Sequence, residues 1–210
     1  MSRSRLKSKL GYDVHPSLAM LEFAIEALKQ KTGRTLEEWV KLAQQEGPET
    51  EKERRDWLKT KYQLSGGDAS WIAERSVGKG WGGNPRIYLK RADIFVERMF
   101  MRAKVDLRPI YEALLKTGRK AGRDVRVCPC QTFVPLYRNH VFAQIKIANR
   151  KRIDLGLALK DTKTPKRLID TGGFARKDRI THRIEITSVD DIDDEVKKWL
   201  KKAYEMDEDE

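Results

Sequence analysis

The sequence contains few of the residues that bind metals or form disulfides: two cysteines, Cys128 and Cys130, and three histidines among 210 residues. Two cysteines cannot build a disulfide framework, and they fit a reducing cytoplasm, which we take as the expected location. No apolar run approaches the roughly 18 residues that a membrane-spanning helix needs, so no membrane partner is expected. The basic first residues have no apolar core behind them, unlike a secretory signal.

The two cysteines lie one residue apart in the stretch VCPCQT, which raises the question of a metal or redox site. A structural zinc site needs four Cys or His ligands, so His140 and His182 would have to join, and its paired cysteines are usually further apart. A redox pair is typically Cys-x-x-Cys. The spacing fits neither site. We predict no metal and no cofactor, and interpret both cysteines as small residues at the start of a strand.

Positive charge exceeds negative charge, with 44 Lys and Arg against 32 Asp and Glu and a formal net charge of +12. The excess is concentrated in residues 146–183, where twelve Lys or Arg face four Asp for a net charge of +8. Such a surplus favours polyanionic partners, of which nucleic acid is the usual one. The alternative is that the charge only keeps the protein soluble.

The first part of the chain predicts a helical domain. Residues 1–14 are expected to be a disordered basic tail, and apolar residues at helical spacing follow over residues 15–77. Thr35 and Glu38 form the pattern of a capping box. The glycine-rich residues 78–85 match G-x-G-x-x-G at Gly78, Gly80 and Gly83. We interpret them as a linker, because a dinucleotide-binding fingerprint follows a strand and a helix is expected here.

Residues 86–206 predict an α+β domain, and residues 207–210 an acidic tail. Two helices come first, and the apolar period then changes to two, as in strands with one apolar face. Acids after Ser188 and lysines further on match the dipole of a last helix. We therefore expect an antiparallel sheet of about four to five strands covered by helices on one face. The expected strands are residues 132–138, 141–147, 153–159 and 182–187.

The polar face of this sheet, together with the basic loop 160–180, is the leading candidate for a binding surface. Aromatic and basic side chains on a sheet hold nucleic acid by stacking on bases and by contacting phosphates. We therefore predict a non-enzymatic protein that binds nucleic acid. The predicted contact residues are Phe142, Lys146, Arg152, Lys166, Arg167, Arg176 and Lys177.

Two sets of residues resemble known families. Residues 31–39, KTGRTLEEW, and Trp57-Leu58-Lys59 are similar to a small helical bacterial domain of unknown function. A second set is similar to another uncharacterised domain that often follows the first: TFVPLYR from Thr132, Phe142-Ala143, Asp154-Leu155-Gly156-Leu157, Thr181-His182-Arg183 and Trp199 to Tyr204. The resemblance implies no established reaction. It implies a context in which such domains occur: the second domain is also appended to restriction-type nucleases, and it is sometimes labelled a predicted transport protein.

Two alternatives to nucleic-acid binding stay open. The first is a small-ligand or enzymatic site around Arg138, Asp154, His182 and Arg183, which requires those four side chains to share a pocket. The alternating strand pattern places His182 on the apolar side, which favours a core histidine. The second alternative is an accessory module, in a restriction or defence type system, whose N-terminal helices dock a protein partner. Catalytic signatures such as G-x-S-x-G are missing.

Overall fold

The computed structural model describes residues 6–79, 85–163 and 165–208, and their side chains except those of residues 19–22. The chain divides into two compact units. The helical unit is Pro16–Tyr88, and the sheet unit combines Met1–His15 with Leu89–Glu210. The sheet unit is therefore built from two separate stretches of sequence.

The helical unit is held together by an apolar core that includes Leu28, Trp39, Leu58 and Ile72. The capping box of Thr35 is confirmed: its hydroxyl accepts from the Glu38 amide, and the Glu38 carboxylate accepts from the Thr35 amide at 2.7 Å. Local capping chemistry therefore sets where a helix of this unit begins. The helices are α1 (Ser17–Thr32), α2 (Leu36–Gln45), α3 (Glu51–Tyr62) and α4 (Gly66–Ser76).

The sheet unit is α+β, as predicted. Its six described strands form one antiparallel sheet in the order β1-β2-β3-β4-β6-β5. The short strands β1 and β5 add to the four expected from the sequence. The strands are β1 (Arg126–Val127), β2 (Phe133–Tyr137), β3 (Val141–Ile147), β4 (Ile153–Leu157), β5 (Ile169–Asp170) and β6 (His182–Ile186). The helices are α5 (Pro85–Met99), which belongs to this unit from Leu89 on, α6 (Arg108–Arg119) and α7 (Asp194–Met206), with 3-10 turns at Arg102–Leu107 and Val189–Asp191.

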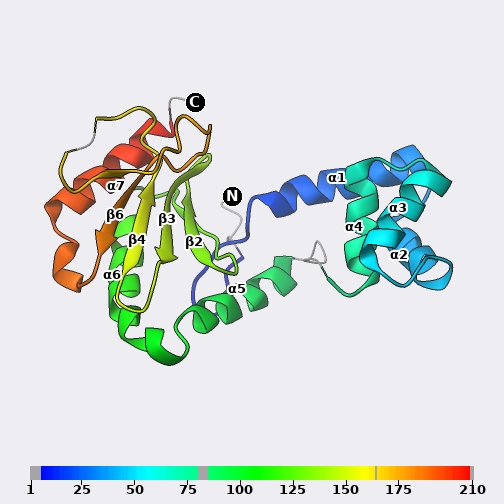
Figure 1. Cartoon of the computed structure of the whole chain (residues 1–210), viewed down its shortest axis with the longest axis horizontal. Coiled ribbons are helices and arrows are strands. Elements are labelled where there is room, and N and C mark those ends of the chain that lie inside the picture. Colours follow the sequence, from blue (N-terminus) through cyan, green and yellow to red (C-terminus); the bar gives the residue numbers. More distant parts are fainter. Residues whose placement is uncertain (1–5, 80–84, 164, 209–210) are drawn as a thin grey trace. The chain divides into compact units, whose positions relative to one another are not determined.

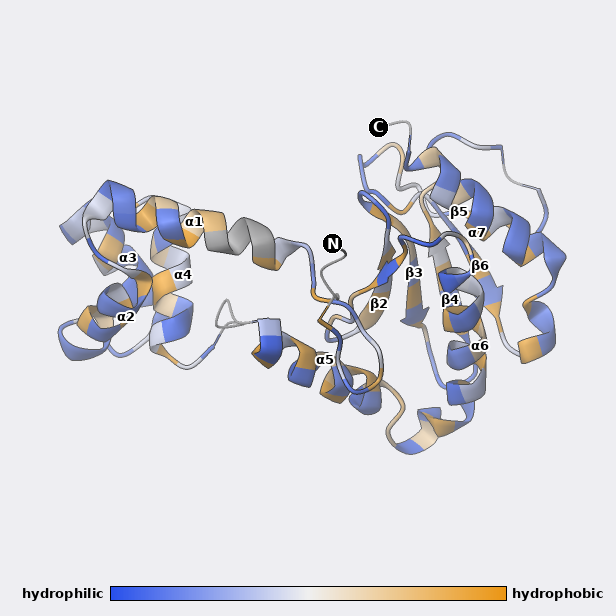
Figure 2. Cartoon of the chain, turned by 180° about the vertical axis from the view of Figure 1, so that it is seen from behind, coloured by the Kyte–Doolittle hydropathy of each residue, from blue (hydrophilic) through white to orange (hydrophobic). Residues whose placement is uncertain are grey.

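Helices α6 and α7 cover one face of the sheet, which is seen from the helix side in Figure 2. Figure 1 shows the opposite face of β2, β3 and β4. The covered face is apolar: Ile145, Leu155 and Ile184 lie in register across three strands and are buried. Helix α6 packs very closely, since a Cβ on Gly118 would lie 2.3 Å from the Leu136 side chain. This one-sided cover leaves the polar face open.

The expectation of a disordered tail is wrong for residues 6–14. Tyr12 and Asp13 are buried, and the Asp13 amide donates to the Val127 carbonyl at 2.8 Å. The Val127 amide donates back to the Asp13 carboxylate at 2.9 Å, and the Tyr12 and Tyr111 hydroxyls are 2.9 Å apart. This segment therefore continues the sheet unit at β1, because it satisfies backbone groups that would otherwise be unpaired. Residues 1–5 lie outside the described part.

Three smaller expectations concern the connecting and terminal residues. Gly80 and Gly83 of the glycine-rich stretch lie outside the described residues, and Gly78 follows α4 with a left-handed φ of 73°. The predicted acidic tail is wrong for Asp207, which is 1% exposed. Among the described residues, no helix is long and apolar enough to cross a membrane.

Candidate nucleic-acid interface

The open face of the sheet carries side chains in rows that cross the strands. Directly paired residues on neighbouring antiparallel strands point to the same face, so the strand register defines these rows. Two rows run from β2 to β6 and contain Phe133, Lys146, Asp154 and Glu185, and Pro135, Gln144, Gly156 and Arg183.

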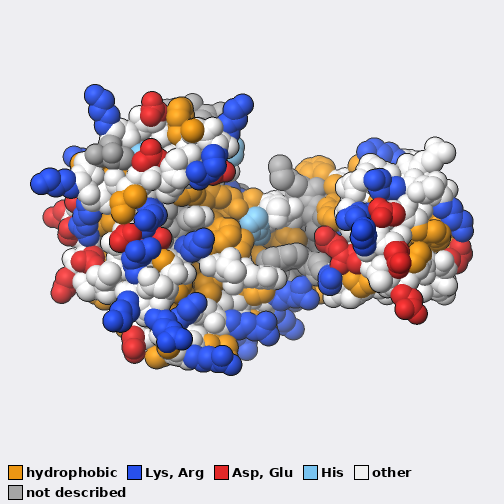
Figure 3. Space-filling model, viewed as in Figure 1, with side chains coloured by type: hydrophobic (Ala, Val, Ile, Leu, Met, Phe, Trp, Pro, Cys, Tyr) orange, Lys and Arg blue, Asp and Glu red, His pale blue; other side chains and the backbone are white. Residues whose placement is uncertain are grey.

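A hollow of about 580 Å³ lies over this face, and we call it the sheet hollow. Its lining includes Phe133, Tyr137, Lys146, Arg176 and Arg183. The volume is in the range of ordinary ligand sites. Figure 3 shows Lys and Arg side chains over this side of the sheet unit, with Asp and Glu among them. The hollow therefore combines rings with charges of both signs.

Two rings of β2 form the aromatic part of the sheet hollow. Phe133 and Tyr137 are both partly exposed, and Phe133 is paired in register with Lys146. The Tyr137 hydroxyl lies 3.0 Å from Nε2 of His15, whose ring meets the tyrosine ring edge-on at 5.4 Å. Burial raises the pKa of Tyr137 to about 12, and burial with the nearby Arg126 lowers the pKa of His15. Both rings are therefore uncharged at neutral pH.

Four charges at the β4–β6 side of this face neutralise one another. Arg152 contacts Asp154 and Glu185, each at 2.9 Å. Arg183 contacts Asp154 at 3.3 Å and Glu185 at 2.6 Å. The hydrogen bond from Arg183, with Arg152 nearby, lowers the pKa of Glu185. The positive charges of both arginines are therefore balanced by carboxylates of the same sheet. Lys146 is the exposed cation of these rows.

Phe142 does not belong to the open face, so its predicted role as a stacking residue is wrong. The side chain is fully buried, and its ring meets that of Tyr204 on α7 edge-on at 5.6 Å. The cause is a register shift: Tyr137 pairs with Val141 and Leu136 with Ala143, which leaves Phe142 as an extra residue. A β-bulge of this kind reverses the alternation on one side of it.

The basic loop supplies cations of two kinds. Arg167 bonds the Asp191 carbonyl and the Asp193 carboxylate, so it secures the start of α7. Arg176 pairs with Asp178 at 2.9 Å and donates to the Thr171 carbonyl, so it holds its own loop together. Lys166 and Lys177 are exposed. The two arginines of this set are thus ion-paired within the protein, and Arg176 is exposed like the two lysines.

The structure does not bring together the four residues of the small-ligand alternative. Asp154 and Arg183 are ion-paired on the open face. His182 is 3% exposed among the apolar residues, where its ring bonds the Thr181 hydroxyl at 2.8 Å and the Thr162 carbonyl at 2.9 Å. The prediction of a core histidine is confirmed, and a site that requires all four side chains to converge is wrong.

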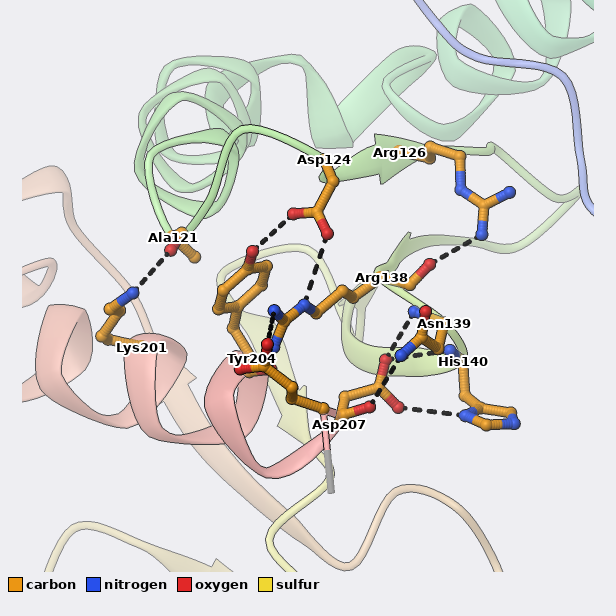
Figure 4. Close-up of polar contacts among 10 residues, drawn as sticks. Ala121, Asp124, Arg126, Arg138, Asn139, His140, Lys201, Tyr204 and Asp207 are labelled. Atoms are coloured by element: carbon orange, nitrogen blue, oxygen red, sulfur yellow. Dashed lines mark hydrogen bonds and ion pairs between the residues drawn. The ribbon is translucent and has the colours of Figure 1, made fainter. Parts of the chain in front are cut away.

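Arg138, the fourth residue, fastens the end of α7 to the loop before β3 (Figure 4). Its guanidinium pairs with Asp124 at 3.3 Å and with Glu208 at 2.9 Å, and it lies 4.3 Å from the centre of the Tyr204 ring. The Tyr204 hydroxyl, as the largest influence, lowers the pKa of Asp124. This arrangement explains Arg138 as a structural residue.

Asp207 completes the same junction. Its carboxylate accepts from the backbone amides of Asn139 and His140 at 2.8 and 2.9 Å and from the His140 ring (Figure 4). It also accepts from Arg179. A carboxylate with this many donors is compatible with deep burial.

The cysteines give no sign of reactive or metal-binding chemistry. Burial raises the pKa of Cys128 to about 12 and that of Cys130 to about 11, so both are thiols at neutral pH. Both are free of disulfides. Within the described part of the chain, no group of three or more His, Cys, Asp or Glu residues could hold a metal ion.

Residues 96–207 match the family model described as Domain of unknown function (DUF5655), which is more than half of the chain. The chain belongs to this family. The DUF5655 region begins inside α5 and reaches the end of α7, so it holds the whole sheet. Residues 22–76, in the helical unit, match Domain of unknown function (DUF4287). No curated protein and no solved structure matches the chain.

The two rings of the DUF5655 sheet that line the hollow, Phe133 and Tyr137, were missed by the sequence reasoning. A signal for them was present: Phe133 and Tyr137 lie four residues apart in β2, so strand alternation places them on the face opposite to the buried Val134 and Leu136. The pairing of Arg152 and Arg183 with carboxylates had no comparable signal, because it depends on strand register.

Proposed function

We propose that this protein binds single-stranded nucleic acid, without a reaction of its own, on the open face of its sheet. The observation that carries the proposal is the placement of Phe133 beside Lys146, with Tyr137 on the same face of the sheet hollow. Rings offer stacking surfaces to unpaired bases, and an adjacent lysine offers a charge to the phosphate. Bases inside a duplex are not available for such stacking, so single strands are the favoured ligand.

The charge distribution sets the expected salt dependence. Arg152, Arg167 and Arg176 are engaged with carboxylates of the protein, so Lys146, Lys166 and Lys177 are the predicted phosphate contacts. Three such contacts on a single strand give a slope of about −2 in a plot of log K against log salt concentration. This is far shallower than the net charge of the chain would suggest.

A fluorescence-anisotropy titration with labelled single-stranded DNA and RNA tests the proposal. We expect binding at low salt with the stated slope, and weaker binding of duplexes. Phe133→Ala should weaken binding about tenfold, as expected for loss of one stacked base. Phe23→Ala, which removes a ring that is 80% exposed on α1, is the matched control. Binding without a salt slope, or equal affinities of the two variants, would contradict the proposal.

The wider biological setting is part of the proposal. The two free thiols support a cytoplasmic location. The resemblance to domains appended to restriction-type nucleases supports a role as an accessory protein of an enzyme that acts on nucleic acid. Pull-down from native lysate, with and without nuclease treatment, separates binding through nucleic acid from direct docking of a protein partner.

A further inference from the structure

A second hollow of about 530 Å³ lies in the sheet unit, and we call it the edge pocket. Three elements line it: the segment after β4, the loop between β5 and β6, and the end of α7. The lining side chains that matter for the argument are Lys160, Phe174, Lys177, Arg179 and Met206.

The charge of the edge pocket is positive once its carboxylates are assigned to their partners. Asp178 pairs with Arg176 at 2.9 Å. Asp207 is buried and accepts hydrogen bonds from Arg179 and from two backbone amides. Lys177, which is exposed, adds a further positive charge to the lining, and the exposed Lys160 lies in the same lining. The pocket is therefore suited to an anion.

Phe174 gives the same pocket a flat apolar surface. It is 55% exposed, although a phenylalanine gains free energy by burying its ring. Its loop is well defined: the Thr171 hydroxyl donates to the Thr181 carbonyl at 2.9 Å, and a Cβ on Gly173 would lie 2.3 Å from the Ile180 carbonyl oxygen. An exposed ring held beside cations can stack on a base.

The two lysines also share an uncommon backbone conformation. Lys160 has a φ of 51° and Lys177 a φ of 59°. The left-handed region is unfavourable for residues with a Cβ, and such residues gather at functional sites. Among the residues that the structure describes, four other than glycine have positive φ, and two of those four line this pocket. A conformation that suits glycine is thus occupied twice by a lysine.

We infer that the edge pocket binds a nucleoside monophosphate unit, with the base against Phe174 and the phosphate near Lys177. This inference rests on the proposed function, because it names a subsite for the strand on the open face. Asp178 and Arg179 line both the edge pocket and the sheet hollow, so the two hollows adjoin at the β5–β6 loop. The volume is within the range of small-molecule sites.

Calorimetric titration of the full chain with adenosine monophosphate, adenosine and inorganic phosphate at low salt tests the inference. The monophosphate should bind more tightly than either fragment, because it alone makes both contacts. Phe174→Ala should weaken it about tenfold, and Phe174→Tyr, which keeps the ring, should retain the affinity. Lys177→Met should weaken it and reduce its salt dependence, whereas Lys198→Met, an exposed lysine on α7 outside the pocket, should not.

The result separates this inference from the proposed function. Phe133→Ala lies in the sheet hollow and should leave monophosphate binding unchanged while it weakens oligonucleotide binding. Absent monophosphate binding, or binding that Phe174→Ala and Lys177→Met leave intact, overturns the inference even if oligonucleotides bind. Monophosphate binding that requires Phe174 supports the inference even if oligonucleotides fail to bind. In that case only the proposed function is contradicted. Thermal unfolding of each variant checks that the fold is retained.

Discussion

Phe133 and Phe142 lie on neighbouring strands with the same side chain and opposite surroundings. Phe142 is fully buried against Tyr204, whereas Phe133 is partly exposed in the sheet hollow. Phe142→Ala should therefore lower the free energy of unfolding by about 3–5 kcal/mol through lost burial and a residual cavity. Urea denaturation measures this change.

The matched comparison is Phe133→Ala, which removes the same atoms from an open position. We expect a much smaller loss of stability and a larger loss of oligonucleotide affinity. Equal destabilisation by the two variants would show that Phe133 serves the core, and its assignment to a binding face would then be wrong.

Individual elements show where the sequence was informative. The capping box at Thr35 was predictable because its partners are three residues apart. The strand alternation of β4 and β6 was predictable because the residues that face the helices are apolar in β4 and, apart from His182, apolar in β6. The burial of Phe142 in β3 was not, because the bulge there depends on the pairing with β2, whereas the alternation from Ala143 to Lys146 follows the expected pattern. Two-residue strands such as β5 depend on their neighbours entirely, since they have no periodicity of their own.

The sequence did not predict that the end of α7 is anchored, because Asp207 looks like the start of an acidic tail. Asp207→Asn removes the charge that faces Arg179 while it keeps a similar shape. We expect a loss of about 2 kcal/mol in the free energy of unfolding, because an asparagine side chain has one acceptor oxygen where the buried carboxylate has two, so donors at this junction lose an acceptor. Urea denaturation measures the loss, and hydrogen exchange should be faster in α7.

Glu205→Gln on the same helix is the control for Asp207→Asn. Glu205 pairs with Lys201 at the surface, where ion pairs contribute little. If both substitutions left α7 equally protected, Asp207 would not anchor the helix.

At the scale of the whole molecule, the sheet unit is discontinuous. The family match to the sheet region begins at residue 96, yet residues 6–15 also belong to this unit and come before the helical unit in the chain. Sequence periodicity could not predict this, because Asp13 and its partner Val127 are 114 positions apart. The two units are therefore interleaved in sequence, with the helical unit inserted between two parts of the sheet unit.

This arrangement predicts that a substitution near the start of the chain lowers the stability of strands that come more than 100 residues later in the sequence. Asp13 is 3% exposed and accepts from the Val127 amide and from Lys7, so Asp13→Ala leaves a buried amide without its partner. The cost should be about 2 kcal/mol. Hydrogen exchange should become faster in β1 and β2 and stay unchanged in α2 to α4. Asp56→Ala, an exposed position on α3, is the control and should not alter exchange in the sheet. Unchanged protection of β1 and β2 in Asp13→Ala would mean that the sheet unit is stable without its N-terminal segment.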